Sequence, residues 1–131
     1  MKYLFPVFIF TVLIFSGCSS KPSVIIDEGN AGSEISVKKG DIFEVRLEVQ
    51  FGTGFSWSLT ELPSSIEPVG EPEQIKKGEK KPGAYEYQVF RYRALSEGEI
   101  ELHYVYEQPW EKGDPPAERV NFTIKITGNT N

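Results

Sequence analysis

The sequence predicts an all-β fold, an antiparallel β-sandwich of about seven strands. Three runs alternate apolar and polar residues with a period of two, and no segment repeats its apolar residues with the 3.6-residue period of an amphipathic helix. Turns containing Gly or Pro separate the runs. Because each run has one apolar and one polar face, we expect two sheets that share one buried core.

The three clearest strands are expected at residues 43–49, 100–106 and 120–126. A fourth run, over residues 85–94, changes parity after Val89, which indicates either a β-bulge or a strand with both faces buried. Shorter strands are expected at residues 35–37, 56–59 and 66–69. This number of short strands in about a hundred residues is typical of an immunoglobulin-like sandwich. The single Cys excludes an intramolecular disulfide between the sheets.

Residues 1–17 are expected to be a bacterial lipoprotein signal peptide. Lys2 precedes an apolar run over residues 3–15, which suits a signal peptide and is shorter than the roughly 20 residues of a membrane-spanning helix. The run ends in small residues directly before Cys18, and this pattern resembles a lipoprotein cleavage box. The alternative is an uncleaved N-terminal anchor with an incidental Cys.

The lipoprotein resemblance implies that Cys18 is acylated. Residues 18–23 would then form a polar tether, and residues 24–131 would form the folded domain. An acylated Cys18 could not act as a nucleophile. The protein would sit on a bacterial membrane and face the periplasm or the cell exterior.

Composition argues against several functional classes. The net charge of −5 is opposite to that of a nucleic-acid-binding surface. One Cys and one His cannot build a tetrahedral zinc site from these ligands, so neither a metal nor a cofactor is expected. His103 lies in a predicted strand, and no sequence motif supplies a nucleophile for it. We therefore expect His103 to be a surface residue, and the protein not to be an enzyme.

Trp110 is the most informative residue of a predicted loop. It follows a strand and precedes a polar, Pro-rich segment. Its side chain could fold back and close the end of the sandwich. It could instead be an exposed binding anchor, since Trp is enriched at interface hot spots. Composition alone does not distinguish these two interpretations.

Three segments resemble a known family when they are taken in order. They are Gly52-Thr53-Gly54-Phe55-Ser56-Trp57, Pro82-Gly83-Ala84, and Tyr104-Val105-Tyr106-Glu107-Gln108-Pro109-Trp110-Glu111. In this order they resemble the chagasin-type inhibitors of papain-like cysteine peptidases, whose loops carry Asn-Pro-Thr-Thr-Gly-aromatic, Gly-rich and Arg-Pro-Trp segments. The resemblance covers residues 33–127. The chain departs from it at Gln50, Phe51 and Gly52, which replace Asn, Pro and Thr, and at Gln108, which replaces Arg.

The resemblance implies a reversible, non-covalent peptidase inhibitor. Three loops at one end of the sandwich would wedge into the active-site cleft of a papain-like cysteine peptidase. The expected binding residues are Phe51, Gly52, Thr53, Gly54 and Phe55 (the first loop), Pro82, Gly83 and Ala84 (the second loop), and Gln108, Pro109 and Trp110 (the third loop). Thr53 and Gly54 would lie closest to the catalytic residues of the peptidase. The inhibitor is expected to be a monomer without catalytic residues of its own.

The alternative is a surface-anchored, immunoglobulin-like binding module for a glycan or an envelope protein. The position of the exposed aromatic side chains distinguishes the two hypotheses. A glycan-binding module should present them as a platform on a sheet face, whereas the inhibitor should gather them at one end.

Overall fold

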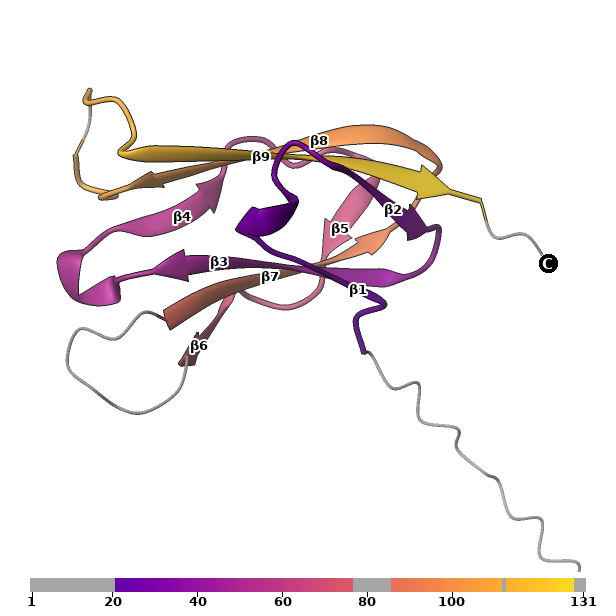
Figure 1. Cartoon of the computed structure of the whole chain (residues 1–131), viewed down its shortest axis with the longest axis horizontal. Coiled ribbons are helices and arrows are strands. Elements are labelled where there is room, and N and C mark those ends of the chain that lie inside the picture. Colours follow the sequence, from indigo (N-terminus) through magenta and orange to yellow (C-terminus); the bar gives the residue numbers. More distant parts are fainter. Residues whose placement is uncertain (1–20, 77–85, 112, 129–131) are drawn as a thin grey trace, which may run out of the picture.

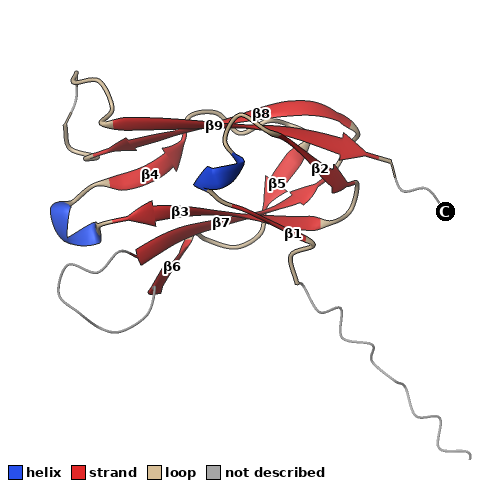
Figure 2. Ribbon diagram, in the orientation of Figure 1, coloured by secondary structure: helices blue, strands red, loops and turns tan. Residues whose placement is uncertain are grey.

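The computed structural model describes residues 21–76, 86–111 and 113–128, which form a sandwich of two β-sheets (Figure 1). Nine strands and two short 3-10 helices are present in these residues (Figure 2). No helix in the described ranges has the length and apolar character that a membrane span requires. The second loop, with Pro82, Gly83 and Ala84, lies outside the described residues.

The first sheet contains five strands and is centred on β3 and β7. Its members are β1 (Val24–Ile26), β3 (Ile42–Val49), β5 (Ile66–Pro68), β6 (Glu73–Lys76) and β7 (Glu86–Ala94). β7 is antiparallel to β3 and also pairs with both β5 and β6. β1 pairs with β3 in the parallel direction and begins at Val24, opposite Phe43. The chain therefore enters the sheet at the end of β3 that lies away from Val49.

The second sheet contains four strands in the order β2, β9, β8, β4. Their bounds are β2 (Glu34–Lys38), β4 (Ser56–Leu59), β8 (Gly98–Glu107) and β9 (Glu118–Thr127). β2 and β9 are parallel, and the other pairs are antiparallel. The all-β sandwich is confirmed, but both sheets are mixed rather than purely antiparallel. Alternation of apolar and polar residues did not reveal this, because it is the same for either strand direction.

The inward-facing residues of both sheets form a single core around Tyr104. Its ring centroid lies 5.0 Å from that of Phe90 and 6.2 Å from that of Phe122. Its hydroxyl is 2.8 Å from the hydroxyl of Tyr92, so these two buried polar groups satisfy each other. Burial raises the pKa of Tyr92 to about 12 and the pKa of Tyr104 well above its usual value.

The change of parity in β7 reflects two buried faces and not a bulge. The register with β3 is continuous from Ile42 opposite Arg93 to Val49 opposite Glu86. Val89 is buried on the outer face of the first sheet, whereas Phe90 packs in the core. An ionic network covers part of that outer face.

The centre of this network is Glu44, which is buried although it points away from the core. Its carboxylate accepts hydrogen bonds from Arg46 and, at 3.0 Å, from Nε of Arg91. Arg91 also lies 3.0 Å from a carboxylate oxygen of Glu73. Two guanidinium groups thus compensate one buried carboxylate, which would otherwise be costly to remove from water.

Candidate functional site

The strands place the first and third of the predicted binding loops at one end of the sandwich (Figure 1). β3 ends at Val49 before the first loop, and β8 ends at Glu107 before the third loop. β6 ends and β7 begins at the same end, since Lys76 and Val49 both pair with Glu86. These two strands flank the segment that contains the second loop.

The first loop is closed by local hydrogen bonds. A 3-10 turn, η2 (Phe51–Thr53), follows β3. The amide and the hydroxyl of Thr53 both donate to the carbonyl oxygen of Gln50, at 3.1 and 2.6 Å. Gly54 then adopts a φ of +80°, a left-handed conformation that favours glycine over residues with a Cβ atom. Gly52 and Thr53 are exposed at the tip.

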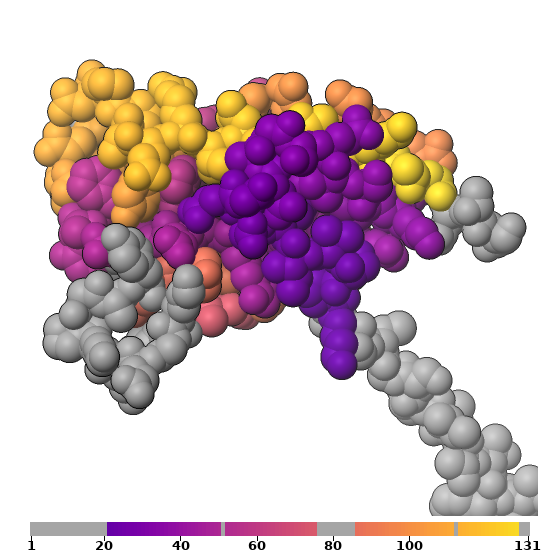
Figure 3. Space-filling view, in the orientation of Figure 1, coloured from indigo at the N-terminus to yellow at the C-terminus, as the bar shows by residue number. Residues whose placement is uncertain are grey.

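The third loop packs directly against the first loop. The side-chain amide of Gln108 donates to the carbonyl oxygen of Thr53 at 3.1 Å. The indole of Trp110 lies so close to Gly54 that a Cβ atom there would collide with Cη2 of the ring. Atoms of the two loops adjoin in the space-filling view (Figure 3).

Trp110 remains 65 % exposed despite its contact with Gly54. Its side chain therefore does not fold back to close the sandwich, which was the first of the two interpretations. The ring is instead supported on one side by the first loop and open to solvent on the other. Trp110 is an exposed aromatic residue that lies at the loop end, not on a sheet face.

Trp57 contacts both strands that lead into the loops, β3 and β8. Its indole N–H donates to the carbonyl oxygen of Glu48 in β3 at 2.8 Å, and its ring lies 4.9 Å from that of Tyr106 in β8. Its backbone N–H donates to Oε1 of Gln88 in β7 at 2.8 Å, and Nε2 of Gln88 donates back to the Trp57 carbonyl at 2.9 Å. Trp57 is buried, as its position in a strand predicted.

Tyr106 holds both ends of the first loop. Its hydroxyl accepts a hydrogen bond from the backbone N–H of Gln50 at 3.2 Å. Its ring stacks on Phe55, with 5.2 Å between the ring centroids. Phe55, expected to be a binding residue, is half-buried and contributes one face of its ring to this support.

Sequence reasoning did not identify Gln88 or Tyr106 as parts of the site. A signal for Gln88 was present, because it shares the inward parity of Phe90 and Tyr92 although it is polar. A polar residue at an inward position is expected to have a hydrogen-bonding partner. Tyr106 carried no such signal, since an aromatic residue at an inward position is ordinary core.

The described residues contain no group of His, Cys, Asp and Glu side chains that could hold a metal ion. His103 is exposed on the outer face of the second sheet. Its Nδ1 lies 2.6 Å from the side-chain oxygen of Asn121, and its Nε2 lies 3.1 Å from a carboxylate oxygen of Glu101. The prediction that His103 is a surface residue is confirmed.

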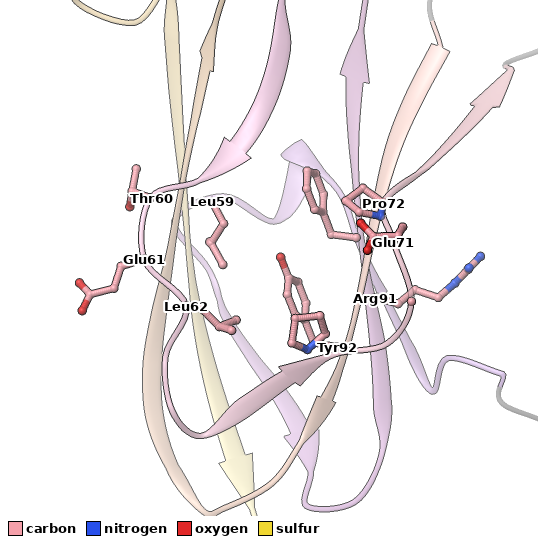
Figure 4. Close-up of a pocket in the computed structure, with 11 residues that line it drawn as sticks. Leu59, Thr60, Glu61, Leu62, Glu71, Pro72, Arg91 and Tyr92 are labelled. Carbon is pink, nitrogen blue, oxygen red and sulfur yellow. The ribbon is translucent and has the colours of Figure 1, made fainter. Parts of the chain in front are cut away.

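A pocket of about 350 Å³ opens on the side of the sandwich, between the edge of β4 and the segment around β5 (Figure 4). Leu59, Leu62 and Tyr92 line it. None of the predicted binding residues that the structure describes belongs to this pocket. It is therefore separate from the loop surface.

A rigid β-sandwich that presents supported loops at one end has the architecture of a protein that binds a partner by shape. The chain belongs to the chagasin family of peptidase inhibitors. The model of that family, described as chagasin family peptidase inhibitor I42, matches residues 36–126. The resemblance inferred from the sequence is confirmed, and the family is one of inhibitors and not of enzymes.

Several solved structures share the fold. The cysteine protease inhibitor EhICP2 from Entamoeba histolytica is 17% identical, with a TM-score of 0.70; the match covers 82% of this chain and 100% of that one. The solution structure of amebosin is 22% identical, with a TM-score of 0.61, and the match covers 83% of this chain and 100% of amebosin. No curated protein sequence matches the chain.

Proposed function

We propose that this protein inhibits papain-like cysteine peptidases reversibly and without a covalent bond, by inserting its loop end into the active-site cleft. Family membership supports an inhibitor, and the observation that carries the mode of action is the supported exposure of Trp110. A large aromatic side chain is open to solvent while its ring lies against Gly54. This combination is characteristic of a preformed binding anchor.

The first loop suits close approach to catalytic residues. Its tip presents Gly52 and Thr53 to solvent, and the hydroxyl of Thr53 is engaged in closing the turn. The tip therefore offers backbone and a short side chain to a narrow cleft. Occlusion requires no chemistry from the inhibitor. The loop arrives already folded, so that little conformational entropy is lost when it docks.

The position of Trp110 argues against the alternative, a glycan-binding module. Such a module is expected to place aromatic rings as a platform on a sheet face. The exposed ring of Trp110 instead lies on the loop end, beside the first loop. This placement favours a partner with a concave surface, such as a peptidase cleft.

Membrane attachment through Cys18 is a further part of the proposal. Acylation after removal of residues 1–17 would leave a short tether before β1, which begins at Val24. The protein would then act as a monomer on the periplasmic or outer side of a bacterial membrane. Cys18→Ala should abolish incorporation of a labelled fatty acid, whereas Ser19→Ala should not. Label retained in Cys18→Ala would contradict the anchor.

Titration of papain with the fragment from Ser19 onward tests the inhibitory function. The fragment contains every described strand and core residue. We expect tight, reversible inhibition that Trp110→Ala weakens by about 2 kcal/mol or more, roughly thirtyfold. Leu95→Ala is a matched control, because Leu95 is also an exposed apolar residue (40 %) but follows β7 at the opposite end. Failure to inhibit papain and several related peptidases would refute the proposal.

A further inference from the structure

We propose that Gln108 is a positioning residue that latches the third loop to the first, so that Trp110 and Gly54 form one binding surface before any peptidase is present. The inference rests on the proposed inhibitory function and deepens it. Gln108 and Thr53 are 55 positions apart in the sequence, and their hydrogen bond joins the two loops. The contact between Trp110 and Gly54 is the second point at which these loops meet.

A closed turn in the third loop fixes the position of Trp110 relative to Gln108. The backbone N–H of Glu111 donates to the carbonyl oxygen of Gln108 at 3.0 Å, which closes a four-residue turn. Pro109 occupies the second position of this turn, where its fixed φ is favourable. Because the turn is closed and stiff, holding Gln108 against the first loop also holds Trp110 over Gly54.

The chemistry of the latch requires a donor at position 108. The acceptor is a backbone carbonyl, which cannot donate a hydrogen bond in return. Gln108→Ala removes the donor, whereas Gln108→Arg retains N–H groups on a longer side chain. Gln108→Glu places a carboxylate against the carbonyl oxygen and should break the latch at least as thoroughly as Gln108→Ala.

Loss of the latch should reduce the fraction of molecules in which both loops are docked. The apparent affinity falls in proportion to that fraction, because only the docked form matches the cleft. Loss of a hydrogen bond of ordinary strength lowers the equilibrium constant for docking about threefold to tenfold, and this sets the largest decrease in affinity. The decrease should affect the association rate, since the bound complex holds the loops in place by itself.

The test measures the loop contact in the free inhibitor by NMR and the rate at which the inhibitor binds papain by stopped flow. In the NMR spectrum of the fragment from Ser19 onward, the ring current of Trp110 should shift the α protons of Gly54. Gln108→Ala should move these resonances toward ordinary glycine values, and Gln108→Arg should restore the shift. Gln74→Ala is the control, because Gln74 is an exposed glutamine of β6 outside the loops. An unchanged Gly54 shift in Gln108→Ala would overturn the inference.

Stopped-flow measurement with papain supplies the second readout. Gln108→Ala should slow association, by at most about tenfold, and leave dissociation nearly unchanged. An effect confined to the dissociation rate would mean that Gln108 contacts the peptidase directly, which would overturn the positioning role. If the unmodified fragment does not inhibit papain, the proposed function fails, while the Gly54 resonances still decide whether the latch exists.

Discussion

The side-chain amide of Gln88 makes two hydrogen bonds with the backbone at the edge of β4, where a neighbouring strand would otherwise pair. It accepts from the N–H of Trp57 at 2.8 Å and donates to the carbonyl of the same residue at 2.9 Å, so that it links β7 of one sheet to β4 of the other. Gln88→Ala removes both hydrogen bonds in a half-buried location. At about 0.5–1.5 kcal/mol for each bond, the free energy of unfolding should fall by roughly 1–3 kcal/mol.

Urea-induced unfolding, followed by circular dichroism, measures this loss. Gln74→Ala is the matched control: Gln74 pairs with Gln88 across β6 and β7 but is exposed. The control should change the free energy of unfolding by less than about 0.5 kcal/mol. If Gln88→Ala is as stable as Gln74→Ala, water replaces the amide at the β4 edge without cost, and the reasoning from the two bonds is refuted.

Three other perturbations test the core and the loop end. Trp57→Ala should lower the free energy of unfolding by about 3–5 kcal/mol in the same urea assay, because it empties a buried site that links three strands; a loss below about 1 kcal/mol would contradict this role. Gly54→Ala should cost about 1 kcal/mol of stability through its positive φ, and it should also weaken papain inhibition because Trp110 is displaced. Gly52→Ala is the control, because no atom lies within 4 Å of a new Cβ there, and it should leave stability unchanged. Equal losses of stability in Gly52→Ala and Gly54→Ala would argue against backbone strain at Gly54. Burial raises the pKa of Tyr92 to about 12, so the folded state retains a proton that the unfolded chain loses near pH 10. Stability should therefore be complete below pH 10 and decrease as the pH rises toward 12, and a midpoint of urea unfolding that stays constant over this range would refute the assignment.

The sequence predicted the strands whose alternation extends over several residues. β3, β8 and β9 each direct one side of a long period-two run into the core, and this pattern depends only on local order. β1 and β6 were not expected, because Val24–Ile26 is apolar throughout and Glu73–Lys76 contains one apolar residue, so neither segment alternates. They are defined by the neighbours with which they pair, β3 and β7.

The sequence likewise placed the first and third loops at one end but did not reveal how they are joined. The family motif locates Gly54 and Trp110, yet their contact depends on how closely two loops approach in space. The same holds for Gln88, whose partner Trp57 is 31 positions away. Such contacts depend on the packing of the two sheets, which local periodicity does not describe.

The parallel pairing of β1 with β3 separates the N-terminal tether from the loop end by the length of β3. From Phe43 to Val49, β3 spans about 20 Å, and the six tether residues 18–23 add at most about 20 Å more. If Cys18 carries lipid, the tether joins the domain at Val24, at the end of β3 that lies away from the loops. A peptidase would then meet the inhibitor from the aqueous side, without having to fit between the domain and the membrane. Confinement to the bilayer would then keep the loop end of each inhibitor accessible to peptidases on the periplasmic or outer side of that membrane.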